Sequence, residues 1–234
     1  MCVRYTLHKS DAALSAVAKA IGRIFNLPTW VEDRYNIRIS EVAPVFAIQD
    51  GGVRLEPMTF GLVSPYAKEH GLKKLLHNAR SETVTSLRSF RDPVRYRRCL
   101  IPANGFYESM TVGKVSRPFV FMLKDEEPFA IAGIWEPPVD EAGQGSFSML
   151  TTRPNEVVEP LHDRMPVVLT PRDMPRWLGS DPLPDSVLVD LCRPISGAKM
   201  VAREVNRYGN KPRSEGPGCL TPPDAAEPEL PLSL

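Results

Sequence analysis

The chain has 234 residues, of which 42% are hydrophobic and 24% charged, and its formal net charge is +1. This is the composition of an ordinary globular protein. It has no run of about eighteen apolar residues and no basic N-terminal region followed by an apolar stretch, which excludes a spanning helix and a secretory signal. We therefore expect a cytoplasmic protein. The near-neutral charge excludes a polybasic, histone-like binder.

Residues 11–25 carry apolar side chains at helical spacing and predict the first helix, which Ser10 or Asp11 can cap. From residue 34 onward, short apolar runs broken by proline and glycine predict strands at 42–48, 58–63, 98–103, 118–123, 129–135, 146–151, 165–169 and 200–205. Short helices are predicted at 83–90, 171–178 and 185–192. Strands with occasional helices indicate an α+β domain. Residues 221–234, rich in proline and acid, predict a disordered tail.

The four cysteines (Cys2, Cys99, Cys192 and Cys219) are far apart and form no CxxC pair. This spacing argues against a structural metal site and gives no disulfide framework, so we expect free thiols. Cys99 lies in an apolar run and is expected in the core. Cys2 directly follows Met1, and removal of Met1 would give it a free α-amine beside its thiol. Such a 1,2-aminothiol can condense with an aldehyde, although a cysteine at this position usually has no chemical role.

Three polar clusters interrupt the apolar texture: HNARSET (77–83), ANGFYES (103–109) and LHDRMPV (161–167). Glu108 lies among aromatic and apolar residues, which raise a carboxyl pKa and suit a proton donor and acceptor; alternatively it is a surface glutamate at a strand end. His162 titrates in a useful range but is also compatible with a structural role. Asn78 offers an amide, and Arg80 and Arg164 offer charge for a phosphate.

Six arginines lie within residues 80–98, against two acids. Such a cluster fits a limited phosphate-contacting face. A solvated helix face with packed arginine stems explains it equally well.

Taken together and in this order, the opening MC, NARSET, CLIPANGFYE, PFVF followed by FAIAGIWE, and LTTRPN leading to HDRMP resemble the SOS response-associated peptidase (SRAP) family of abasic-site processing proteins. The resemblance runs from Met1 to about Leu220. It implies one SRAP-like domain over 1–220, with a mixed, mostly antiparallel, barrel-like sheet and several short helices. Residues 221–234 lie outside it.

Five positions depart from the family pattern. Val3 replaces a glycine, and Arg38 and Ile39 replace an Ala-Pro pair. Phe60 and Ser109 each stand where the family has tryptophan. The last two changes remove aromatic surface that would stack on bases, so they affect the expected mode of DNA binding more than the chemistry.

The resemblance implies that the protein senses abasic sites in single-stranded DNA and forms a thiazolidine crosslink through Cys2, shielding the lesion during the DNA damage response. It implies a lyase-like Schiff base step on Cys2, proton transfer by Glu108 and His162, and positioning by Asn78. Phosphate contacts are expected from three arginines: Arg4, Arg80 and Arg164. No cofactor or metal is expected, and the protein is expected to be a monomer.

Two alternatives remain open. One is a cysteine peptidase (a hydrolase) that uses Cys2, His162 and Glu108 and is limited to removing its own Met1. The other is a non-enzymatic binder of single-stranded DNA.

Overall fold

The computed structural model describes residues 3–71, 75–113, 115–139, 143–179 and 181–223. Its strands are β1 Arg4–Leu7, β2 Arg34–Arg38, β3 Val42–Gln49, β4 Gly52–Phe60, β5 Asn78–Arg80, β6 Arg98–Ala103, β7 Gly105–Val112, β8 Val115–Leu123, β9 Phe129–Glu136, β10 Ser146–Thr152, β11 Met165–Pro166, β12 Val168–Leu169 and β13 Met200–Glu204. Its α-helices are α1 Ser10–Ala20, α2 Pro65–Glu69, α3 Arg91–Tyr96, α4 Asp173–Leu178 and α5 Asp185–Leu191. Three 3₁₀ turns near the C-terminus are η1 Gly197–Lys199, η2 Arg207–Asn210 and η3 Pro217–Leu220.

The strands form two sheets, which confirms the predicted α+β class and its mixed, mostly antiparallel pairing. One sheet has the order β13-β8-β7-β1-β2. The other runs β11-β10-β4-β3-β6-β9-β12, with β5 paired to β10. Only the pairings of β10 with β4 and with β5 are parallel among the strands that the structure describes.

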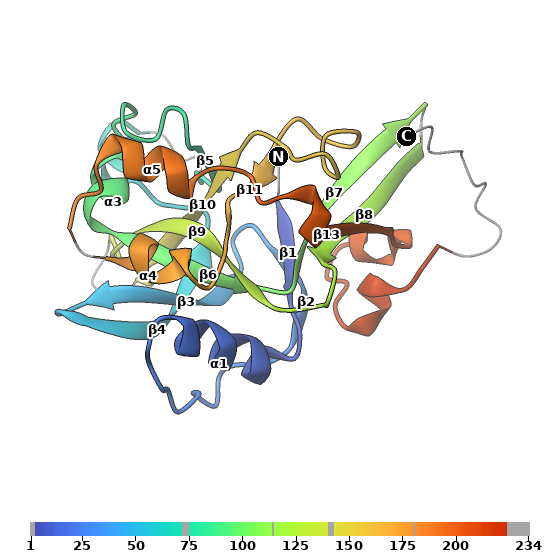
Figure 1. Ribbon diagram of the computed structural model, residues 1–234, viewed down its shortest axis with the longest axis horizontal. Coiled ribbons are helices and arrows are strands. Elements are labelled where there is room, and N and C mark those ends of the chain that lie inside the picture. Colours follow the sequence, from blue (N-terminus) through green and yellow to red (C-terminus); the bar gives the residue numbers. More distant parts are fainter. Residues whose placement is uncertain (1–2, 72–74, 114, 140–142, 180, 224–234) are drawn as a thin grey trace.

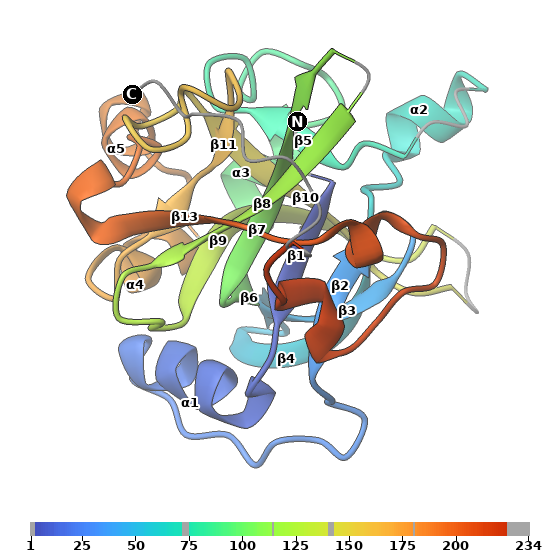
Figure 2. The same ribbon diagram turned by 90° about the vertical axis from the view of Figure 1, so that its right-hand side faces the viewer.

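Two apolar layers hold these elements together. One lies between the sheets and contains Tyr5, Phe106 and Phe121 from the smaller sheet with Phe60 and Phe147 from the larger one. The other lies between the larger sheet and the helices. Figure 1 shows α3, α4 and α5 gathered on the side away from β7 and β8, and Figure 2 views the smaller sheet from its outer face.

The larger sheet is thus buried on both faces, and β9 shows how the sequence encodes this. Phe129, Ile131 and Trp135 face the layer between the sheets, while Ala132 and Ile134 face the helices. A strand covered on both faces carries a continuous apolar run instead of an alternating one. This is why the runs at 98–103, 129–135 and 146–151 were recognisable, and all three strands are confirmed.

The helix predictions are partly confirmed. The predicted helix at 11–25 is α1 but ends at Ala20, and the helices at 171–178 and 185–192 are α4 and α5. The helix predicted at 83–90 is wrong, because this segment is a series of turns before α3 begins at Arg91. Its hydroxyl groups compete for backbone partners, as when Ser86 Oγ donates to the Thr83 carbonyl at 2.9 Å.

Among the described residues no helix is both long enough and apolar enough to cross a membrane. Cys99, Cys192 and Cys219 are free and buried, and Cys99 is in the core as expected. The part of the chain that the structure describes holds no group of three or more side chains arranged to bind a metal. The tail prediction concerns residues 221–234, of which 224–234 lie outside the described residues.

Candidate active site

The strand that follows the N-terminus lies beside the strand that carries Glu108. In the antiparallel pairing of β1 with β7, Tyr5 is opposite Phe106 and Thr6 is opposite Gly105. Continued by one residue, this register sets Arg4 opposite Tyr107, and the Arg4 guanidinium lies 5.0 Å from the Tyr107 ring centre. Glu108 is the next residue on β7. Cys2, the expected nucleophile, lies outside the described residues.

Glu108 is held within a strand. It lies in the middle of β7, opposite Phe119 of β8, and is 8% exposed. Gly105 fixes the start of this strand, because a Cβ there would come within 2.9 Å of the Phe121 carbonyl oxygen. Burial raises the pKa of the Glu108 carboxyl to about 7. The alternative of a surface glutamate is therefore wrong.

His162 approaches Glu108 from the loop between β10 and β11. Its Nε2 lies 3.8 Å from Glu108 Oε2, within ion-pair range but longer than a hydrogen bond. Its Nδ1 accepts the backbone N–H of Arg164 at 3.0 Å. Burial lowers the pKa of His162, which favours the neutral imidazole at pH 7. The same Nδ1 also lies 3.0 Å from Asp163 Oδ1, while Nε2 is on the side of Glu108.

A side-chain turn at the start of this loop sets its path. Asn155 Oδ1 accepts the backbone N–H groups of Val157 and Val158, each at 3.1 Å. Asn155 Nδ2 donates to the Ile195 carbonyl at 3.0 Å. The backbone N–H of His162 then donates to the Val158 carbonyl at 2.9 Å. The asparagine of LTTRPN therefore positions the histidine.

Asn78 and Arg80 belong to β5, which runs parallel to β10. The register sets Asn78 opposite Met149 and Arg80 opposite Thr151. Asn78 is partly buried, whereas the side chain of Arg80 is exposed and makes no hydrogen bond or ion pair with the described residues. Arg80 is therefore available to a ligand.

Arg164 lies near the same residue of β10. Its Nη2 donates to the Thr151 carbonyl at 2.6 Å. Its guanidinium also forms a two-pronged ion pair with Glu82, at 2.8 and 2.9 Å. The hydrogen bonds from Arg164 lower the pKa of Glu82. Glu108, His162 and Arg164 thus form a row of neighbouring residues, which ends near Arg80. Nothing in the sequence indicated that Glu82 is the ion-pair partner of Arg164.

Arg4, the third expected phosphate contact, is engaged with the C-terminal segment. It donates to the Gly209 carbonyl at 2.5 Å and to Asn210 Oδ1 at 2.7 Å. The Gly209 carbonyl also accepts from Asn36 and from Arg38, at 3.1 and 2.6 Å. These contacts anchor β1 and β2 beneath η2.

The arginine cluster at 80–98 divides between surface and interior. Arg98 is 2% exposed and donates to five backbone carbonyls, which belong to Val94, Arg95, Trp177, Gly179 and Asp181. Arg97 pairs with the buried Glu136 at 2.9 Å. Arg88 lies over the Tyr66 ring at 5.5 Å. The reading as packed arginines is correct for Arg98, which joins α3 to α4.

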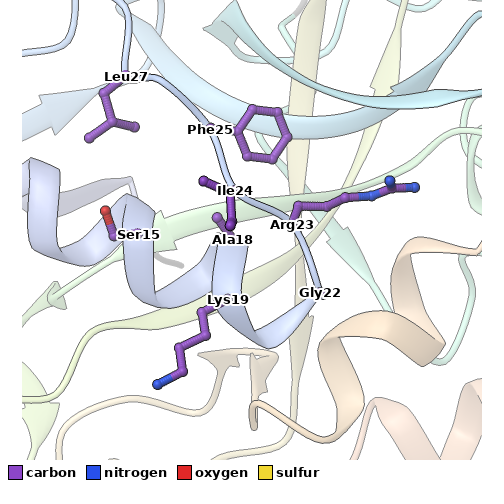
Figure 3. A pocket seen from close by; sticks show the side chains of 8 residues that line it. All are labelled: Ser15, Ala18, Lys19, Gly22, Arg23, Ile24, Phe25 and Leu27. Carbon is purple, nitrogen blue, oxygen red and sulfur yellow. The ribbon is translucent and has the colours of Figure 1, made fainter.

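A pocket of about 520 Å³ lies elsewhere, at the end of α1, and Figure 3 shows its lining. Ile24 on its rim is 98% exposed. In Figures 1 and 2, α1 lies at the end of the molecule opposite β5 and β11. The pocket is therefore remote from the row that begins at Glu108.

The fold and the site define an α+β protein in which a buried carboxyl, Glu108, lies 3.8 Å from the half-buried His162. A family model described as SOS response associated peptidase (SRAP) matches residues 1–212. The chain is 33% identical over 189 residues to the abasic site processing protein YoqW of Bacillus subtilis, which covers 80% of this chain and 84% of that protein. It is 32% identical over 224 residues to the abasic site processing protein YoaM of the same organism, with 94% and 97% covered.

A crystal structure of a protein from Bacteroides thetaiotaomicron matches with a TM-score of 0.77 at 22% identity, covering 94% of this chain and 99% of that one. This likeness supports the fold alone. The family match and the relatives show that the chain belongs to the SRAP family.

Proposed function

We propose that this protein processes abasic sites in single-stranded DNA by forming a covalent adduct through Cys2, after removal of Met1. Relatives that cover most of the chain are named abasic site processing proteins. An abasic sugar is in equilibrium with an open aldehyde, and a 1,2-aminothiol is suited to trap that group.

The observation that carries the proposal is the position of the Glu108–His162 pair beside β1. β1 begins at Arg4, which the register sets opposite the residue preceding Glu108. Two peptide units keep the α-carbon of residue 2 within about 7 Å of the α-carbon of Arg4. This short connection supports an encounter of the Cys2 amine and thiol with a carboxyl whose pKa is about 7.

The chemistry follows from those groups. The Cys2 α-amine, with a pKa of about 8 when free, adds to the aldehyde carbon and forms a carbinolamine. Protonation of its hydroxyl by Glu108 allows water to leave and gives the imine. The Cys2 thiol then adds to the imine carbon, its proton goes to the nitrogen, and a five-membered thiazolidine closes. The tether makes this last step unimolecular, with a large gain in effective concentration.

His162 and Asn78 take the remaining roles in the proposal. The imidazolium form of His162 donates its Nε2 proton to the sugar ring oxygen while the anomeric hydroxyl gives its proton to water, which opens the hemiacetal to the aldehyde and leaves a neutral imidazole. Asn78 hydrogen-bonds the sugar or the amine. Arg80 and Arg164 contact flanking phosphates, which positions the strand without reading its sequence.

Variants at Cys2 test the adduct directly. Cys2→Ala is expected to abolish the heat-stable adduct with an abasic oligonucleotide on a denaturing gel while DNA binding stays nearly unchanged. Cys2→Ser keeps the amine, so borohydride is expected to trap an imine that does not close to a stable ring. Intact mass of the purified protein establishes whether Met1 is absent. A Cys2→Ala variant that still formed the heat-stable adduct in equal yield would refute the aminothiol mechanism.

Variants at the acid–base pair separate a built site from a merely reactive N-terminus. Positioned acid–base groups contribute roughly 10²–10⁴ in rate. Glu108→Gln and His162→Ala are therefore expected to slow single-turnover crosslinking across pH 5.5 to 8.5 with binding preserved. A substrate held as an open aldehyde is expected to rescue the histidine variant more than the glutamine variant. Rates within a factor of two of wild type at every pH would make both residues structural.

A further inference from the structure

A second pocket, of about 270 Å³, adjoins the outer end of the row of site residues. It is lined by Ser81, Glu82, Thr152, Arg153, Leu188, Val189, Cys192, Arg193 and Pro194. Two of these residues follow Arg80 directly in the chain, and Glu82 is the ion-pair partner of Arg164. The pocket therefore shares a wall with the proposed phosphate contacts.

The floor of this pocket is apolar and comes from α5 and the residues that follow it. Leu188 and Cys192 are 6% and 4% exposed, whereas Val189 is 72% exposed at the rim. Burial raises the pKa of the Cys192 thiol to about 12, so it stays protonated and acts as an apolar side chain. A ligand with a flat, apolar face can pack against this aliphatic surface.

The charges around the pocket favour an anion at its rim. Glu82 is neutralised by Arg164, and Arg193 forms an ion pair with Asp190. Arg153 is exposed and its guanidinium makes no hydrogen bond or ion pair within the described part of the chain. Arg153 comes two residues after Thr151, which is opposite Arg80. Two uncompensated arginines, Arg80 and Arg153, thus flank the neutral Glu82–Arg164 pair at the same end of β10.

We propose that this pocket binds the base of a nucleotide flanking the lesion, with the Val189 side of α5 against the base and Arg153 on the adjacent phosphate. The inference rests on the proposed function and names a subsite of the same strand. Binders of single strands combine cationic side chains along the backbone with surfaces that stack on bases.

The state of Phe60 supports this assignment. It is fully buried between Tyr5 and Phe147, with ring centres 5.9 and 5.2 Å away. Phe60 therefore presents no surface on which a base could stack. The pocket at α5 supplies apolar surface beside the phosphate contacts.

A base-deletion scan tests the subsite. The lesion position carries an unreactive tetrahydrofuran analogue, and each nucleotide on either side of it is replaced in turn by the same spacer. The dissociation constant is measured by fluorescence anisotropy. In the wild type, one flanking position is expected to weaken binding by about tenfold when its base is removed. Val189→Asp is expected to abolish that penalty, because it puts an anion where the base lies. Arg153→Ala is expected to reduce the salt slope by about 0.7.

The pocket at α1 provides matched controls. Ile24→Asp and Arg23→Ala make the same chemical changes at exposed positions of that remote pocket and are expected to behave as wild type. A scan with no sensitive position, or a penalty that persists in Val189→Asp, overturns the subsite. Adduct formation at saturating DNA is expected to be unchanged in the control Ile24→Asp. Loss of the adduct in the wild type itself would instead count against the proposed function.

Discussion

The buried carboxyl of Glu108 makes the fold less stable as pH rises, and Glu108→Gln removes this effect. Burial raises the pKa from an ordinary 4.5 to about 7. For an acid whose folded pKa is raised, stability is fully present below the unfolded pKa and is lost as pH rises through the folded pKa. The complete loss is about 3 kcal/mol, from roughly 2.5 pKa units at 1.36 kcal/mol each. Between pH 5.5 and 8.5 the same linkage gives about 2 kcal/mol.

Urea unfolding of the wild type and of Glu108→Gln at pH 5.5, 7 and 8.5 measures this pH dependence of the unfolding free energy. The difference in unfolding free energy is expected to change by about 2 kcal/mol over this range in favour of the variant. The glutamine amide can pack differently from the carboxyl and so change the stability by a constant amount. This constant cancels, because only the pH dependence is compared. Glu69→Gln, at the exposed end of α2, is the control and is expected to show no such trend. A flat difference would mean that Glu108 is ionised in the folded state and would remove the basis for its proton transfer near neutral pH.

Three further changes have expected outcomes. Arg80→Ala is expected to weaken single-stranded DNA binding and to lower the slope of log affinity against log salt by about 0.7, with Arg23→Ala unchanged; equal slopes would exclude Arg80 from the binding face. Glu82→Gln is expected to tighten binding in the same titration, because it removes an anion and releases Arg164; weaker binding would show that the pair positions Arg164 instead. Arg98→Ala is expected to cost about 3 kcal/mol or more in urea unfolding, because it leaves buried carbonyls without their donor, and near-wild-type stability would contradict that role.

The sequence predicts the doubly buried strands well, because their apolar runs have no other plausible reading. It fails for β1, β2 and β7, whose charged and polar residues mask the strand pattern. RYNIR of β2 is an example, since its Asn36 donates inward to Gly209 and Ser214 instead of facing water. The bounds predicted for the strand at 58–63 are wrong, because β4 is Gly52–Phe60. Its first residues are mostly half-exposed and do not form an apolar run.

For the candidate site, the sequence offers a set of residues but not their arrangement. Three polar clusters far apart in the chain marked Asn78, Glu108 and His162. The 3.8 Å separation of Glu108 and His162 depends on the fold, which brings β7, the strand that carries Glu108, to the loop shaped by the Asn155 turn. The arginine cluster at 80–98 shows a different limit. In the sequence, Arg98 has the pattern of a surface cation. Its five carbonyl partners come from two segments more than seventy residues apart, and a local pattern cannot reveal such contacts.

The three donors that meet at the Gly209 carbonyl tie the beginning of the chain to a segment made near its end. Arg4, Asn36 and Arg38 obtain these bonds only when residues 207–210 have been synthesised and folded onto β1 and β2. β1 in turn fixes where the N-terminus leaves the sheet. A nascent chain that lacks η2 therefore has a first strand without these side-chain bonds, although its pairing with β2 and β7 is possible. A cut ahead of Arg207 recreates that condition in the finished protein. Under the proposed function, aldehyde-trapping chemistry would reach full strength only once synthesis is nearly complete.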